Sequence, residues 1–157
     1  MCIRDSSNTL VNNRTHYQMS RRPGDALGAT RTTFANNLLL GGATAAKIEG
    51  PYTDGVWSGN LAWQVTSPGD LPAGYIKADP LLTPDASGIM RPQEGSPALG
   101  AAVGNFPAVN VDLDGQARPA PMSIGADELS VTPVQARWLT AADVGPQAGN
   151  VSGEAAR

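Results

Sequence analysis

The chain has 157 residues, a formal net charge of −3 and only 16% charged residues. It contains 18 Gly and 13 Pro but few aromatic residues, a composition that argues against helical bundles, coiled coils and highly charged disordered chains. No run of about 18 apolar residues occurs, and the single cysteine, Cys2, excludes a disulfide framework and a CxxC metal site. We therefore expect a turn-rich β protein.

The first six residues read as a sequencing artefact. Back-translation of MCIRDS gives codons that resemble a transposon-end adapter used in DNA library preparation. We therefore set residues 1–6 aside from the fold and expect the natural N-terminus to lie upstream. On this interpretation Cys2 is not part of the natural protein.

Three asparagines each precede a short, mostly apolar strand. They are Asn8, Asn37 and Asn60, and the strands are expected over residues 8–11, 37–40 and 60–63. Repeats of roughly 20–30 residues that contain strands indicate a solenoid. Asn tolerates left-handed backbone, and equivalent asparagines in stacked turns can bond one another, so we expect a structural ladder.

Further strands are expected between the Asn-led ones, over residues 16–19, 32–35, 45–48 and 55–57. Residues 21–29 form a loop that lengthens the first repeat. Two or three short strands per repeat, joined by sharp turns, predict an all-β fold in which residues 7–66 are the last coils of a parallel β-helix.

Prolines interrupt the rhythm beyond Gln64 and forbid regular central strands there. We expect residues 67–146 to form an irregular cap over the open end of the solenoid, with one short helical turn over residues 96–102. Residues 132–145 are expected to form an arm that docks through Trp138 and Leu139. Residues 147–157 are expected to be a flexible tail.

The acidic segment from Asp112 to Gly115 resembles the opening of a calcium loop. The further oxygen ligands and the closing Glu of such a loop are missing, so we expect a turn in which Asp114 bonds nearby backbone and Gly115 has positive φ. Asp127 and Glu128 are expected to pair with Arg118. We assign no metal ligand to this chain.

The N-terminal third is basic, because Asp25 is the only acid between residues 7 and 48. Rings stack on sugar faces and guanidinium groups pair with carboxylate or sulfate. The candidate residues for binding an anionic carbohydrate are Arg14, His16, Tyr17, Arg21 and Arg22. The alternative is that these residues belong to an ordinary exposed loop.

His16 is the only histidine, so a Ser-His-Asp triad and a His metal cluster are unsupported. No motif predicts nucleic-acid or membrane binding.

Trp57 and Trp63 lie at strand positions of the same parity, which favours core or rung-stacking roles over ligand platforms.

Several of these segments resemble polysaccharide lyase family six, which includes alginate lyases and chondroitinase B-like enzymes. The likeness covers about residues 8–146. It rests on FANNLL from Phe34, IEGP from Ile48, WSGN from Trp57, ADPLL from Ala78, GSPA from Gly95, DLDGQAR from Asp112, IGADE from Ile124 and LTAADVGP from Leu139.

The resemblance implies a right-handed parallel β-helix that cleaves an acidic polysaccharide by β-elimination and is secreted or periplasmic. In that family a calcium ion neutralises the uronate carboxylate and acidifies C5–H, a lysine is the base and an arginine assists as acid. We expect these groups on coils upstream of Asn8, so no residue here is assigned as catalytic and the chain alone is expected to be inactive.

The first interpretation is therefore a C-terminal fragment of an alginate-lyase-like enzyme. Three alternatives stay open. One is a chondroitinase B-like lyase acting on dermatan or chondroitin. Another is a non-catalytic β-helix that binds polysaccharide or serves as a surface scaffold. The third is a β-helix enzyme of different chemistry with the same cap.

Overall fold

The computed structural model describes residues 4–20, 30–50 and 52–131. This part of the chain is all-β and contains no helix, and hence none that could cross a membrane. Its strands are β1 (Arg4–Ser6), β2 (Thr9–Val11), β3 (Thr15–Met19), β4 (Thr33–Ala35), β5 (Leu38–Leu40), β6 (Thr44–Ile48), β7 (Val56–Ser58), β8 (Leu61–Trp63), β9 (Ser67–Gly69), β10 (Leu82–Pro84) and β11 (Met90–Pro92).

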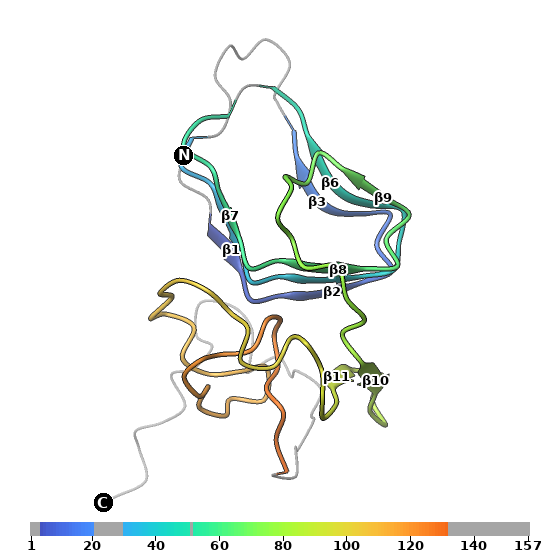
Figure 1. The fold of residues 1–157 in the computed structure, drawn as a ribbon, viewed down its shortest axis with the longest axis vertical. Coiled ribbons are helices and arrows are strands. Elements are labelled where there is room, and N and C mark those ends of the chain that lie inside the picture. The colour runs from blue at the N-terminus through green and yellow to red at the C-terminus, as the bar shows by residue number, and fades with distance from the viewer. Residues whose placement is uncertain (1–3, 21–29, 51, 132–157) are drawn as a thin grey trace, which may run out of the picture.

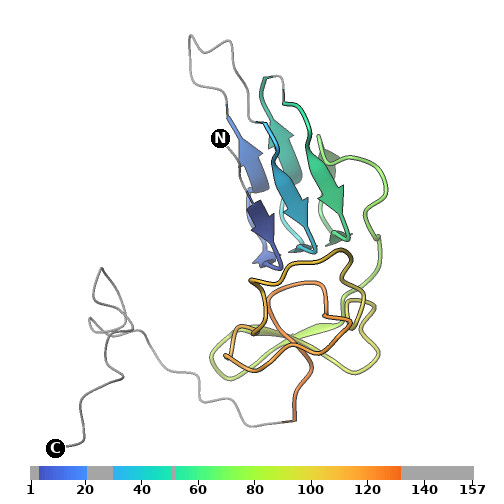
Figure 2. The same cartoon turned by 90° about the vertical axis from the view of Figure 1, so that its left-hand side faces the viewer.

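The first nine strands form three parallel sheets, β1-β4-β7, β2-β5-β8 and β3-β6-β9. The chain visits the three sheets in turn and then repeats the circuit, which gives the three-sided outline of Figure 1. Figure 2 shows strands of successive circuits side by side. Equivalent residues stack in register, as Leu10, Leu39 and Ala62 do. The arrangement is compatible with a parallel β-helix, and each of the seven predicted strands is confirmed.

A left-handed residue turns the chain at the corner between the first two sheets in every circuit. Ser7, Asn36 and Gly59 occupy this position, with φ of 59°, 55° and 62°. A Cβ on Gly59 would lie 2.1 Å from Asn36 Oδ1, so in this last circuit the position needs glycine for space as well as for its backbone conformation.

The asparagines that follow this corner form the predicted ladder. Asn8 Nδ2 donates to Asn37 Oδ1 at 3.0 Å, and Asn37 Nδ2 donates to Asn60 Oδ1 at 3.3 Å. The backbone N–H groups of Asn8 and Asn37 donate to the same two oxygens, each at 3.0 Å. Asn37 and Asn60 are buried, so the ladder satisfies polar groups inside the stack.

Aromatic and aliphatic side chains fill the interior between the three sheets. The ring of Phe34 lies 4.3 Å from that of Tyr17 and 5.2 Å from that of Trp57, measured between centroids. Beyond β9 the chain crosses the end of the stack, where Leu71 and Tyr75 join this core. The last circuit is thereby covered.

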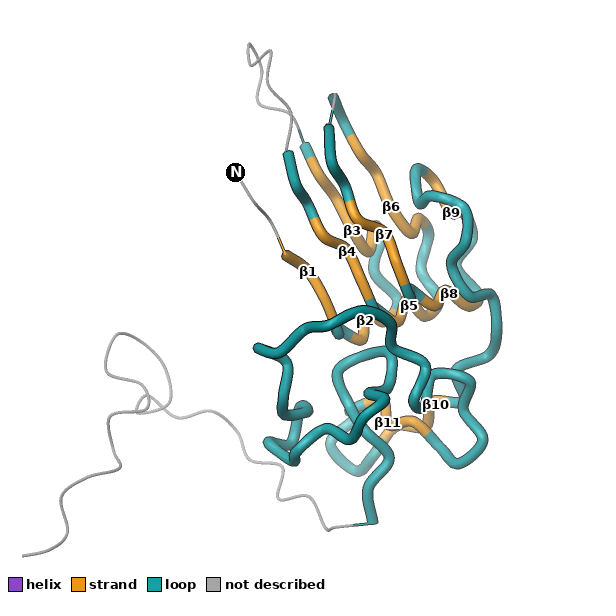
Figure 3. Tube along the Cα trace, turned by 60° about the vertical axis from the view of Figure 1, so that its left-hand side comes forward, coloured by secondary structure: helices purple, strands orange, loops and turns teal. Residues whose placement is uncertain are grey.

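A second apolar cluster lies on the outer face of sheet β2-β5-β8. Alternation points Leu39 inward and Leu38 outward, and Leu38 and Leu61 pack against Ala98 and Ile124 of the later segment. Residues beyond β9 therefore pack beside this sheet, as Figures 2 and 3 show, and do not simply cover the open end as the sequence predicted. Outward-facing leucines explain the difference because they too need burial.

The expectation that both tryptophans pack against the core is confirmed, but they lie on opposite faces of the coil. Trp57 packs in the interior, whereas Trp63 packs against the outer cluster, because the corner at Gly59 separates β7 from β8 and resets the alternation.

Strand β1 comes from the segment that the sequence analysis set aside. It pairs with β4, and Asp5 stands opposite Phe34 in a column that otherwise holds aromatic rings. Burial raises the pKa of Asp5, although hydrogen bonds from Asn8 and Asn37 oppose the shift. The adapter origin of residues 1–6 stays a prediction.

The prolines beyond Gln64 predicted no regular central strands there, and the three strands that form are short and contain proline. β9 lies at a sheet edge, and β10 and β11 make an antiparallel pair, which is where proline is tolerated. The expected helical turn over residues 96–102 is a series of hydrogen-bonded turns. The loop 21–29, the arm 132–145 and the tail 147–157 lie outside the described residues.

Candidate functional site

Two of the five predicted carbohydrate-binding residues are buried. His16 and Tyr17 are each 8% exposed. Tyr17 points into the aromatic core, and His16 Nε2 lies 2.8 Å from the carbonyl oxygen of Gly41. Strand alternation directs Tyr17 inward and the corner at Gly41 covers His16, so the burial of both rings argues against direct contact with a sugar.

Arg14 is exposed in the turn before β3, while Arg21 and Arg22 lie outside the described residues. Farther along β3, the outer face of sheet β3-β6-β9 presents the exposed register partners Gln18 and Lys47. Lys47 Nζ lies 2.7 Å from an oxygen of Glu49. Arg14 is thus the predicted binding residue that the described part of the chain leaves accessible.

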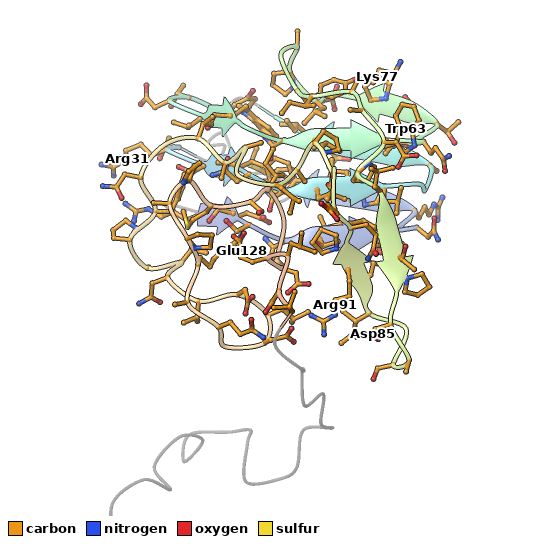
Figure 4. All side chains as sticks on the ribbon, turned by 60° about the horizontal axis from the view of Figure 1, so that its bottom comes forward. Arg31, Trp63, Lys77, Asp85, Arg91 and Glu128 are labelled. Carbon is orange, nitrogen blue, oxygen red and sulfur yellow. The ribbon has the colours of Figure 1, made fainter. Side chains whose placement is uncertain are left out.

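Sequence reasoning missed a charged cluster around Arg91 of β11. The guanidinium bonds both carboxylate oxygens of Asp114, at 2.6 and 3.0 Å. Its Nε donates to Asp85 at 3.0 Å, and its Nη1 lies 3.1 Å from Asp127 Oδ2. Figure 4 shows Arg91 and Asp85 together beside the β10-β11 pair. Loops bring these residues together from distant positions without a periodic signal.

The cluster shifts the pKa values of its members in different directions. Burial would lower the pKa of Arg91, but hydrogen bonds to Asp114, Asp127 and Asp85 outweigh it and raise that pKa. Burial raises the pKa of Asp127, and the negative charges of Asp114 and Asp112 add to the shift against the opposing effect of Arg91. At Asp85 desolvation would raise the pKa, but hydrogen bonds from Ile89, Arg91 and Ser87 together outweigh it, so the pKa is lowered.

The predicted turn at Asp112 is confirmed, but its hydrogen-bond acceptor differs. Asp112 Oδ1, and not Asp114, accepts the backbone N–H groups of Asp114 and Gln116 at 3.0 and 2.9 Å, and Gly115 has a φ of 77°. Asp114 is thereby free to pair with Arg91.

Of the two predicted partners of Arg118, Glu128 is confirmed and Asp127 is not. Arg118 Nε donates to Glu128 at 2.8 Å, while Asp127 pairs with Arg91. Arg118 also donates to the carbonyls of Ser123 and Gly125. Gly125 N–H in turn donates to the carbonyl of Asn36, so this group fastens the later segment to the coil.

A pocket of about 400 Å³ opens beside Arg91, with Asp85, Asp114, Asp127 and Glu128 among its lining residues. Among the described residues, Asp112, Asp114 and Asp127 are the group that could hold a metal ion, since each offers an oxygen within 4.8 Å of the others. No lysine or histidine lines this pocket, so it offers carboxylates and one guanidinium.

Comparison with protein-family models finds no match to this chain. Comparison with curated proteins finds no significant match either.

Proposed function

We propose that the chain forms the last coils and the cap of a right-handed parallel β-helix belonging to a polysaccharide lyase similar to family six. Three parallel sheets, each receiving one strand from every circuit, support the proposed fold. The proposal includes a secreted or periplasmic location.

One observation carries the proposal furthest. Several residues on which the resemblance rests help to hold the coil and the later segment together. Asn37 and Asn60 belong to the ladder, and Arg118 binds Glu128 where the IGADE segment contacts the coil. This correspondence supports a shared architecture, and the lyase activity is inferred from the resemblance alone.

The proposed reaction is β-elimination on an acidic polysaccharide, with alginate as the first substrate to test. A base removes the proton at C5 of the uronate, and the glycosidic oxygen at C4 leaves. Negative charge develops on the uronate carboxylate in the transition state, and a cation bound there lowers the activation barrier.

The carboxylates of the described residues do not fit the catalytic calcium of the family. Asp112, Asp114 and Asp127 surround Arg91 in the later segment, and no lysine lines the adjacent pocket. Lys47 lies on a different surface, where it pairs with Glu49. We derive no catalytic step from these groups and assign the chemistry to coils outside the described residues.

The outer face of sheet β3-β6-β9 is the proposed path for the polysaccharide. Arg14, Gln18 and Lys47 are exposed on or beside it, while the later segment packs on sheet β2-β5-β8. A guanidinium and an ammonium on one open face can pair with successive carboxylates of the polymer. Arg21 and Arg22 stay candidates for binding the polymer, and they lie outside the described residues.

The test measures the absorbance of unsaturated uronate products with alginate, dermatan sulfate and chondroitin sulfate as substrates. We expect this chain to give no product and a protein extended upstream by its own preceding coils to cleave alginate. Cleavage of the two sulfated polymers alone would favour the chondroitinase B-like alternative. Binding of the polymers without cleavage by the extended protein would favour a non-catalytic β-helix and would refute the lyase proposal.

A further inference from the structure

The cluster around Arg91 holds more negative charge than its guanidinium balances. Asp85, Asp114 and Asp127 all contact Arg91, and Asp112 lies next to them. The other arginine of this region, Arg118, is committed to Glu128 and to two carbonyl groups. Within the described part of the chain, four carboxylates therefore share one cation.

Two of these carboxylates are buried and incompletely bonded. Asp112 is 8% exposed and Asp127 is 6% exposed. Asp112 Oδ2 and Asp127 Oδ1 have no hydrogen-bond partner among the described residues. A buried carboxylate oxygen without a partner is costly, and a native fold normally supplies a donor, a water or an ion for it.

The spacing of the oxygens fits a hard cation. Asp112, Asp114 and Asp127 each offer one oxygen, and these atoms lie within 4.8 Å of one another. Oxygens on opposite sides of a Ca²⁺ ion stand about 4.6–5.2 Å apart, since each bond is about 2.3–2.6 Å long. The pocket beside Asp114 and Asp127 gives solvent a route to the site.

We propose that Asp112, Asp114 and Asp127 bind one divalent cation with oxygen preference, such as Ca²⁺, beside the Arg91 guanidinium. The unpartnered oxygens of Asp112 and Asp127 are its first ligands, Asp114 adds an oxygen that Arg91 also contacts, and water completes the shell. The ion ties the Asp112 turn to the segment that holds Asp127, so its role is structural. This inference does not depend on the proposed lyase activity.

The test is calorimetric titration of the metal-free chain with CaCl₂ at constant ionic strength, together with thermal unfolding. We expect one saturable site with a Kd of about 0.1–1 mM, the range of modest calcium modules. At a hundredfold excess of Ca²⁺ over Kd, the Tm should rise by about 5 °C or more, and EDTA should reverse the rise.

Two variants distinguish binding at this site from a nonspecific effect of the chain's net negative charge. Asp127→Asn keeps an oxygen for Arg91 but removes the charge, and it should weaken Ca²⁺ binding at least tenfold. Asp54→Asn removes the same charge at an exposed position and should leave binding unchanged.

Three results would overturn the proposal. The first is no saturable binding by the unsubstituted chain up to about 10 mM CaCl₂, well above the expected Kd. The second is equal weakening of binding in the two variants. The third is that the metal-free Asp127→Asn variant is more stable than the metal-free original chain, while Ca²⁺ does not change the Tm of the original chain. That result would show that a shared proton, and not a cation, relieves the repulsion between the buried carboxylates.

Discussion

Replacement of Asn37 by Ala tests whether the ladder holds the circuits together. The Asn37 side chain is fully buried and makes four hydrogen bonds. Its oxygen accepts the backbone and side-chain N–H groups of Asn8, and its amide donates to the carbonyl of Asp5 and to Asn60 Oδ1. The variant removes all four and leaves the Asn8 N–H and the Asp5 carbonyl without these partners.

At about 1 kcal/mol per net hydrogen bond, the loss is about 4 kcal/mol in the free energy of unfolding. For a chain of this size that lowers the Tm by roughly 8–16 °C. Urea unfolding followed by circular dichroism measures the change, and Asn105→Ala is the matched control because Asn105 is exposed. A loss below about 1 kcal/mol in Asn37→Ala would refute the ladder as a stabilising element.

Three other substitutions test separate parts of the account by the same unfolding measurement. Arg118→Ala leaves the buried carboxylate of Glu128 without its ion-pair partner and should lower the free energy of unfolding by about 3–5 kcal/mol. Arg14→Ala at the surface is the control and should change that free energy by less than about 0.5 kcal/mol. Equal effects of the two substitutions would contradict the burial of the Arg118–Glu128 pair. Leu61→Ala removes a fully buried contact between β8 and the later segment and should cost about 2–5 kcal/mol, and a smaller loss would argue against that packing. Burial raises the folded-state pKa of Asp5 above its ordinary value of 3.8, so the original chain loses stability as pH rises through that folded pKa. Asp5→Asn should flatten this part of the pH profile of stability and raise the Tm at pH 7 by a few degrees. An unchanged profile would place Asp5 in solvent.

The coil was predictable because each repeat has the same short local sequence pattern. Each Asn of the ladder follows a left-handed corner residue and precedes a short apolar strand, so the same local pattern recurs in every circuit. The alternation of Leu38 and Leu39 was also visible, but two opposite apolar faces do not say which one is the interior. The position of the later segment therefore depended on packing that the sequence pattern leaves open.

The candidate sites were harder to predict for a related reason. His16 and Tyr17 are residue types that often bind sugars, yet their exposure depends on the direction of β3 and on the corner at Gly41. The Arg91 cluster joins residues from separate loops, and such contacts follow no period. The one available signal was an excess of acids around Asp112, and it predicted the turn there but not the partners of Asp114 and Asp127.

Pairwise cysteine cross-linking shows whether successive circuits stack in register. Gln18 and Lys47 are exposed register partners on β3 and β6, and parallel neighbours about 4.8 Å apart lie within disulfide range. In a Cys2→Ser background, Gln18→Cys with Lys47→Cys should form an intramolecular disulfide under mild oxidation, identified by peptide mass mapping. Gln18→Cys with Glu49→Cys, which is out of register, should form little. Equal cross-linking of both pairs, or none in the register pair, would contradict the parallel stack.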